Sequence, residues 1–164
     1  MSLLVLTTGG TIDKVYFDAS SEYEIGDPML PMVFRESAVT LPWRLISLLR
    51  KDSLELTEAD RQTIRESCER EPESQILITH GTDTMALTAE ALAGIPGKTI
   101  VLTGALAPAR FRTTDATFNL GLALGAVQSL PPGVYLAMNG TIFPAGKVRK
   151  NKEAGRFETT GPGE

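Results

Sequence analysis

Two short segments rich in threonine and glycine contain the residues best suited to chemistry. One covers residues 8–11 (Thr-Gly-Gly-Thr) and the other covers residues 80–84 (His-Gly-Thr-Asp-Thr). Each follows an unbroken apolar run that is typical of a buried strand, so each lies where a strand ends. Glycine lets a ligand approach backbone N–H groups, which can stabilise an oxyanion, and a threonine hydroxyl beside a base can act as a nucleophile. Thr11, just past the glycines, is best placed for that role.

The same residue types have a plainer interpretation. Threonine and aspartate commonly cap helices, and for either segment alone capping is as good an explanation as catalysis. For both segments together we favour a functional site. A phosphate cradle is not indicated, because no Lys-Ser/Thr pair follows the glycines and the dinucleotide spacing is absent. His80, the one histidine, ends a buried strand, so we expect it to support the loop rather than to shuttle protons.

Alternating strands and helices must position these two segments. Strands are expected at residues 3–8, 43–49, 75–80, 98–103 and 133–139. Helices are expected to begin after the caps Thr57 and Asp115 and at Met85. Continuous apolar strands separated by helices predict a flavodoxin-like, three-layer α/β domain with a mostly parallel sheet in the order 2-1-3-4-5. That order makes the first and third strands neighbours, so both segments should face one crevice.

Two stretches fall outside this pattern. Residues 13–42 predict a long loop over the site, with one helical turn near residues 28–34; a surface excursion is the alternative. The stretch from Gly140 onward carries several basic side chains among few apolar ones, which is typical of a solvated tail. On its residue type and place alone, Lys150 would not be selected as catalytic.

Composition restricts the function classes. A chain of 164 residues with 42% hydrophobic residues is expected to form one domain over residues 1–164. A net charge of −4 provides no basic face for nucleic acid, and no apolar run approaches the roughly 20 residues of a membrane span. Cys68 is the one cysteine, so neither a disulfide framework nor a metal pair is expected. The first residues lack the features of a signal peptide, and we expect a cytoplasmic protein.

Both segments also resemble the paired signatures of the bacterial-type L-asparaginases, which are threonine amidohydrolases. The resemblance continues through residues 104–105, 115–120 and 138–140, with Lys150 downstream, and covers almost the whole chain. It implies hydrolysis of L-asparagine, with L-glutamine as a second candidate substrate, through an acyl-threonine intermediate and without cofactor or metal. A catalytically weak asparagine- or aspartate-binding module, or an amidotransferase-type subunit, is the alternative.

The resemblance also implies roles for individual residues. It implies a catalytic group made of Thr11, Tyr23, Thr82, Asp83 and Lys150. It implies a substrate-binding group made of Gly10, Ser53, Asp83 and Ala105. Thr11 would be the nucleophile and Tyr23 its partner on the lid. Ser53 would receive the substrate carboxylate, Asp83 would hold the ammonium group, and the Ala105 carbonyl would face the leaving nitrogen. On residue type alone, Tyr23 is an ordinary loop aromatic and Ser53 could merely begin a turn.

The chain departs from the family in two respects. Most members have a carboxy-terminal domain that supplies an acid to the substrate ammonium of a neighbouring subunit, and we expect this chain to lack that domain. Leu54 stands where many relatives have glutamine. One hydrogen bond fewer to a charged group costs on the order of 1.5 to 3 kcal/mol, so we expect a raised Michaelis constant. Since the open crevice needs a cover, we also expect a homodimer or a larger homo-oligomer.

Overall fold

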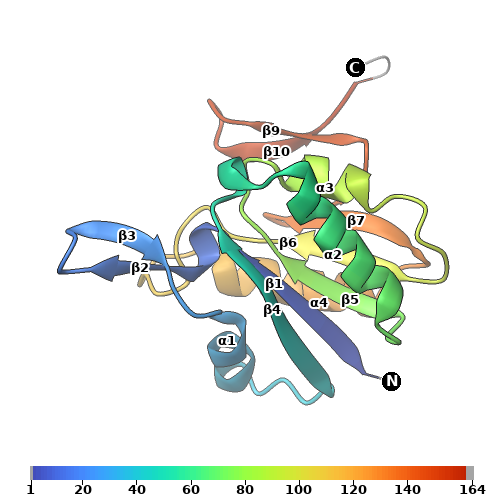
Figure 1. The fold of residues 1–164 in the computed structure, drawn as a ribbon, viewed down its shortest axis with the longest axis horizontal. Coiled ribbons are helices and arrows are strands. Elements are labelled where there is room, and N and C mark those ends of the chain that lie inside the picture. Colours follow the sequence, from blue (N-terminus) through green and yellow to red (C-terminus); the bar gives the residue numbers. More distant parts are fainter. Residues whose placement is uncertain (1, 162–164) are drawn as a thin grey trace.

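A six-stranded sheet forms the centre of the computed structural model, which describes residues 2–161 (Figure 1). Its strand order is β4-β1-β5-β6-β7-β8. The strands are β1 (Leu3–Gly9), β4 (Trp43–Lys51), β5 (Gln75–Thr79), β6 (Thr99–Thr103), β7 (Gly133–Met138) and β8 (Thr141–Pro144). The first five in spatial order are parallel, and β8 pairs antiparallel with β7. The predicted order 2-1-3-4-5 is therefore confirmed, with β8 added at one edge.

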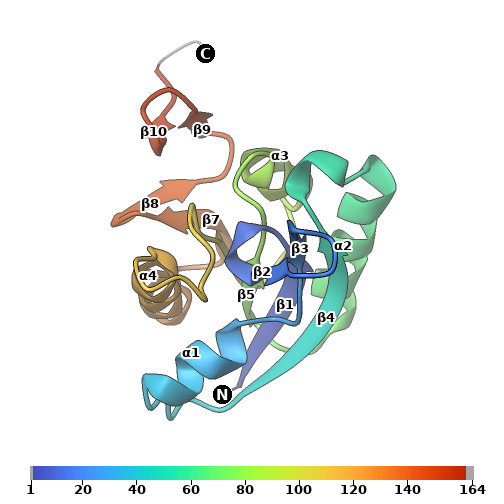
Figure 2. The same cartoon turned by 90° about the vertical axis from the view of Figure 1, so that its left-hand side faces the viewer.

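Helices cover both faces of the sheet, as Figure 2 shows. They are α1 (Leu30–Glu36), α2 (Glu58–Arg70), α3 (Met85–Ala91) and α4 (Ala116–Ser129), with the short 3-10 turns η1 (Thr11–Asp13) and η2 (Ser53–Glu55). Alternate residues of β1 enter two separate cores: Leu4 and Leu6 pack with α2 and α3, while Leu3 and Val5 pack with α1 and α4. This arrangement confirms the three-layer α/β prediction. None of the helices within residues 2–161 has the length and apolar character needed to cross a membrane.

Of the two predicted helix caps, Thr57 caps its helix and Asp115 does not. Thr57 begins α2 with a reciprocal capping box, because its hydroxyl accepts from the Asp60 N–H while the Asp60 carboxylate accepts from the Thr57 N–H. The prediction that Asp115 caps α4 is wrong. Asp115 lies at the N-cap position but makes no side-chain bond to the helix; its carboxylate accepts instead from the N–H groups of Leu106 and Ala107 in the preceding loop.

Residues 13–42 do not form the expected unstructured loop. They contain the hairpin β2 (Lys14–Phe17) and β3 (Glu22–Ile25), followed by α1. Tyr16 and Tyr23 are cross-strand partners whose ring centroids are 5.4 Å apart, a pairing that stabilises the hairpin. The hairpin projects from the body of the domain (Figure 1).

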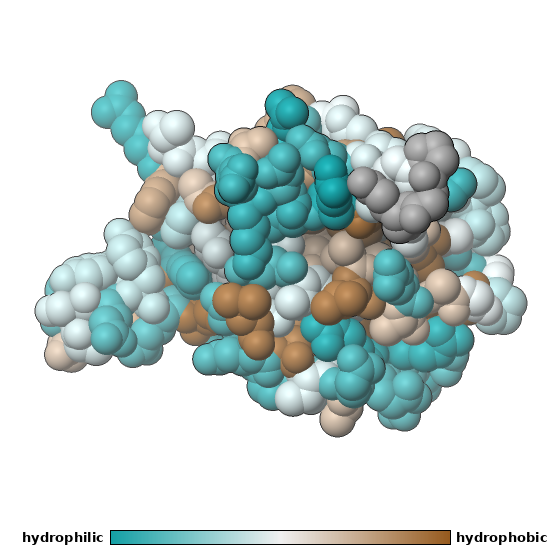
Figure 3. Space-filling view, turned by 90° about the horizontal axis from the view of Figure 1, so that it is seen from above, coloured by the Kyte–Doolittle hydropathy of each residue, from teal (hydrophilic) through white to brown (hydrophobic). Residues whose placement is uncertain are grey.

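The stretch after Gly140 is not a solvated tail. It forms β8 and then the hairpin β9 (Val148–Asn151) and β10 (Arg156–Thr159), which lies above the carboxyl ends of the central strands (Figure 1). Val148 and Phe157 are buried against the α2–α3 side of the core and anchor this hairpin. Seen from the hairpin side, the surface is mostly hydrophilic, with small separate hydrophobic patches (Figure 3).

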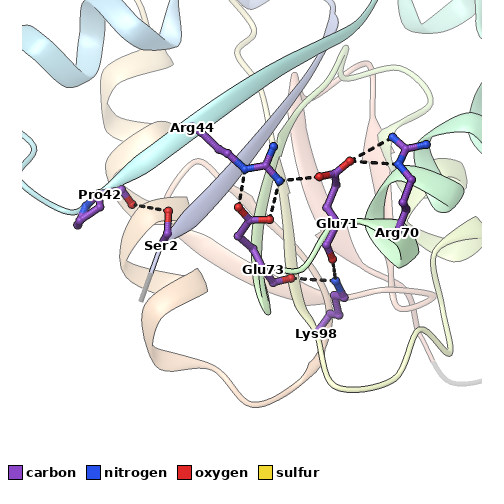
Figure 4. Close-up of polar contacts among 7 residues, drawn as sticks. All are labelled: Ser2, Pro42, Arg44, Arg70, Glu71, Glu73 and Lys98. Atoms are coloured by element: carbon purple, nitrogen blue, oxygen red, sulfur yellow. Dashed lines mark hydrogen bonds and ion pairs between the residues drawn. The ribbon is translucent and has the colours of Figure 1, made fainter.

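At the amino ends of the strands, a network of charged groups joins three segments (Figure 4). Arg44 on β4 bonds Glu71 at 2.6 Å and Glu73 at 2.5 Å, just before β5. The Lys98 ammonium, just before β6, donates to the backbone carbonyls of Glu71 and Glu73. This network lies at the opposite end of the sheet from the threonine-rich turns. A substitution in it can therefore serve as a control variant that leaves the candidate site intact.

Candidate active site

Close backbone contacts at glycine bring the exit loops of the sheet together. Gly10, after β1, has φ +89°, and a Cβ there would overlap the backbone of Gly81, after β5. A Cβ on Gly81 would lie 2.7 Å from the Cβ of Ser53, in the turn after β4. A Cβ on Gly104, after β6, would overlap the His80 carbonyl. The two threonine-rich turns and the loops around Ser53 and Gly104 therefore meet in one place.

Lys150 reaches this place from β9. Its Nζ donates to Thr82 Oγ1 at 2.7 Å and to Asp83 Oδ1 at 2.8 Å, and its side chain is only 17% exposed. The hydrogen bond from Lys150 is the main cause that holds the pKa of Asp83 below its ordinary value. An ammonium group thus lies beside a buried threonine hydroxyl and an ionised carboxylate, an arrangement that can stabilise developing negative charge or move a proton.

Ser53 is buried in η2 and is bonded to the turn that follows β5. Its hydroxyl accepts from the Thr84 N–H at 3.2 Å, and its carbonyl accepts from the Thr84 hydroxyl at 2.7 Å. Thr84 therefore does not cap α3 with its side chain. These bonds fix the Ser53 hydroxyl beside the loop that carries Thr82 and Asp83.

The remaining predicted site residues differ in how enclosed they are. Thr11 begins η1 and is partly buried. Gly10, next to it in the chain, is buried, and so is Ala105 in the loop after β6. Tyr23 is the one exposed residue of the predicted set, with 52% exposure. Its ring packs edge-on against Phe111, with centroids 5.7 Å apart. Tyr23 thus lies on the projecting hairpin, where a closing movement would be needed to enclose it.

His80 has the supporting role that its position predicts. It is fully buried, and Nδ1 donates to the Gly81 carbonyl at 2.6 Å while Nε2 accepts from the Thr88 hydroxyl at 2.7 Å. Burial lowers its pKa to about 4, so the ring is neutral at pH 7. Nε2 thus ties the loop to α3, while Nδ1 bonds within the loop.

Comparison of the sequence with models of known protein families gives evidence that is independent of the geometry. The family model described as "Asparaginase, N-terminal" matches residues 2–159. The chain belongs to the asparaginase family.

Individual asparaginases share the fold across most of this chain. The L-asparaginase of Thermococcus kodakarensis is 36% identical, over 92% of this chain and 48% of that protein. The solved structure of the thermostable L-asparaginase from Thermococcus kodakarensis has a TM-score of 0.83 and covers 97% of this chain and 51% of that one. The chain spans about half the length of the curated asparaginases that it matches. A component of the glutamyl-tRNA(Gln) amidotransferase of Methanococcus vannielii is 39% identical over 49% of this chain and 19% of that protein.

A buried acid that the sequence analysis does not select lies two residues after Thr11. Asp13 is only 2% exposed. Its carboxylate accepts from the Met29 N–H at 2.9 Å, and its carbonyl accepts from the Gly26 N–H at 2.8 Å. Asp13 therefore closes the base of the β2–β3 hairpin. Burial raises its pKa to about 7, against the opposing effect of the Met29 bond and of nearby arginines.

Replacing Asp13 with asparagine is expected to make stability less dependent on pH. In the unfolded chain the carboxyl ionises near pH 3.8, whereas in the folded protein it keeps its proton up to about pH 7. Its contribution is therefore fully present below pH 3.8 and falls by up to about 4 kcal/mol as pH rises from 3.8 to 7. Urea unfolding at pH 5 and pH 8 should show the part of this loss that lies above pH 5, about 3 kcal/mol, in the native sequence and a smaller loss in Asp13→Asn. Equal losses in both proteins would contradict the burial argument.

Proposed function

We propose that this chain hydrolyses L-asparagine to L-aspartate and ammonia, with Thr11 as the nucleophile. The observation that carries the proposal is the 2.7 Å contact between Lys150 Nζ and Thr82 Oγ1, next to the loop that holds Thr11. A weakly nucleophilic hydroxyl needs such polar groups nearby to stabilise or accept charge as it attacks. Membership of the asparaginase family supports an amidohydrolase, and the contact supports the proposed place of its chemistry.

The proposed reaction has two stages. In the first, the Thr11 oxygen attacks the side-chain amide carbon, and backbone N–H groups of the two turns stabilise the oxyanion. The proton of Thr11 passes through Tyr23 to the leaving nitrogen, the C–N bond breaks, and ammonia leaves an aspartyl ester on Thr11. In the second stage, water positioned by Thr82 and Lys150 attacks the ester carbon. The ester bond breaks and L-aspartate is released, while a proton of the attacking water restores the Thr11 hydroxyl.

The proposed substrate contacts use the remaining groups of the site. The Ser53 hydroxyl and the backbone at Gly10 receive the α-carboxylate, and the Asp83 carboxylate holds the α-ammonium. Asp83 suits this role because its lowered pKa keeps it ionised across the neutral range. Leu54 is 66% exposed and offers no hydrogen bond from its side chain, which supports the expectation of weak ammonium binding.

Ammonia release from the purified chain tests this proposal. We expect release from L-asparagine, with L-glutamine as the comparison substrate. Arg44→Met, which disturbs only the network at the amino ends of the strands, should retain activity within about twofold, as is usual for a surface substitution remote from the site. A folded protein that binds L-asparagine without releasing ammonia would contradict the proposal and indicate a binding module.

An amidotransferase-type subunit is the second candidate. The partial similarity to the amidotransferase component of Methanococcus vannielii favours it. Under this alternative, L-glutamine rather than L-asparagine would be the better source of ammonia. The same two-substrate assay therefore distinguishes the two functions.

A further inference from the structure

We propose that Asp115 is a positioning residue that fixes the loop of residues 104–107 against the catalytic turns. The inference rests on the proposed function and adds to it that the Ala105 carbonyl in this loop accepts a hydrogen bond from the leaving nitrogen. Asp115 itself lies at the start of α4 and contacts the loop rather than its own helix.

The Asp115 carboxylate is surrounded by N–H donors. The backbone N–H groups of Leu106 and Ala107 donate to it at 3.0 and 3.1 Å. The side-chain amides of Asn119 and Asn139 donate at 2.9 and 3.1 Å. Partial burial would raise the pKa of Asp115, but these donors hold it below its ordinary value. A group that only accepts is required here, because a side-chain N–H in its place would face other N–H groups.

Asn119 extends the network to the start of the same loop. It is fully buried, its Nδ2 also donates to the Gly104 carbonyl at 2.9 Å, and its Oδ1 accepts from the Asn139 N–H at 2.9 Å. Gly104 lies so close to the His80 carbonyl that a Cβ could not be placed between them. Asp115 and Asn119 therefore hold both ends of the loop, and they hold it directly against the turn that follows β5.

Ala105 lies between these two anchored positions and is 1% exposed. As the C–N bond of the substrate breaks, the leaving nitrogen gains a proton and positive charge. An acceptor carbonyl therefore binds it more strongly in the transition state than in the bound substrate. The methyl ester of the L-aspartate side chain has no N–H on its leaving oxygen, so a displaced Ala105 carbonyl should slow amide cleavage more than ester cleavage.

The experiment compares kcat/KM for L-asparagine and L-aspartate β-methyl ester in Asp115→Asn. We expect kcat/KM for L-asparagine to fall about 100-fold and kcat/KM for the ester to fall about threefold. The larger loss is the size usually found when one preorganised contact to the transition state is removed. Asn139→Gly is the matched control: it removes one donor to Asp115 but keeps the loop bonds, and glycine accepts the φ of 49° found at Asn139. The control should leave the ratio of amide to ester values unchanged.

Hydrogen exchange at the Leu106 and Ala107 amides gives a readout that does not depend on activity. Both amides should be protected in the native sequence and exchange faster in Asp115→Asn. Equal losses for amide and ester, or unchanged exchange, would overturn the inference. If the native protein cleaves neither substrate, the proposed function fails, and exchange alone decides whether Asp115 fixes the loop. If Asp115→Asn does not fold, Asn119→Ser, which loses the bond to the Gly104 carbonyl, must show the same preferential loss of amide cleavage.

Discussion

Replacing Thr11 with alanine is expected to lower ammonia release from L-asparagine by about 10⁴-fold, because the attacking oxygen is removed. The fold should persist, since Thr11 is partly exposed and lies in a short 3-10 turn rather than in a core. A coupled ammonia assay measures the loss, and a thermal melt verifies the fold.

Two further variants control for the loss of a threonine. Thr11→Ser keeps a hydroxyl at the same place and should retain measurable activity. Thr63→Ala removes an exposed hydroxyl on α2 that donates to the Ala59 carbonyl of the same helix, and it should leave the rate unchanged. If Thr11→Ala were as active as the native sequence, Thr11 could not be the nucleophile.

Replacing Lys150 with methionine is expected to lower kcat by about 10² to 10³-fold, in the range found for loss of a group that moves protons or stabilises charge. Methionine has a similar length, so the packing of β9 should persist while the bonds to Thr82 and Asp83 are lost. Steady-state kinetics with L-asparagine measures the effect.

Lys152 provides the matched control for Lys150. It also lies near Asp83, at 3.9 Å, but its side chain is 69% exposed. Solvent screens a contact of this kind, so Lys152→Met should change kcat by less than about threefold. Similar losses of kcat in both variants would show that positive charge near Asp83 in general, rather than the contacts of Lys150, accounts for the activity.

The central sheet and its exit loops could be predicted because their signals are local. β1 and β5 each contain a short unbroken apolar run, residues 3–6 and 76–78, and the threonine- and glycine-rich residues come soon after it. Such strands alternate with helices, which restricts the topology to a few choices. The convergence of Gly10 with Gly81 then follows from the strand order.

Other parts of the site depend on contacts between distant segments. Lys150 lies in a stretch of basic character, and only the buried Val148 and Phe157 show why that stretch folds back onto the domain. Their alternation with charged residues was the available signal. The residue type and position of Asp115 predict a helix cap, and its loop partners Leu106 and Ala107 do not differ in type from other loop residues, so sequence alone cannot show their contact.

The β2–β3 hairpin and the buried Asp13 show a second limit to what the sequence predicts. Lys14–Phe17 and Glu22–Ile25 pair as strands, with Tyr16 in contact with Tyr23. Residues 22–25 alternate between polar and apolar types, but each strand has only four residues, which is a weak signal for a strand. The burial of Asp13 follows from the position of the Met29 N–H at the base of that hairpin. Charged residues are rarely buried without partners, so sequence alone favours an exposed Asp13.

Acid quenching during turnover of L-asparagine, followed by peptide mass spectrometry, would identify the residue that carries the acyl group. We expect an aspartyl ester on the peptide that contains Thr11, formed by the native sequence and absent from Thr11→Ala. An ester on the peptide that contains Thr82 instead would contradict this expectation.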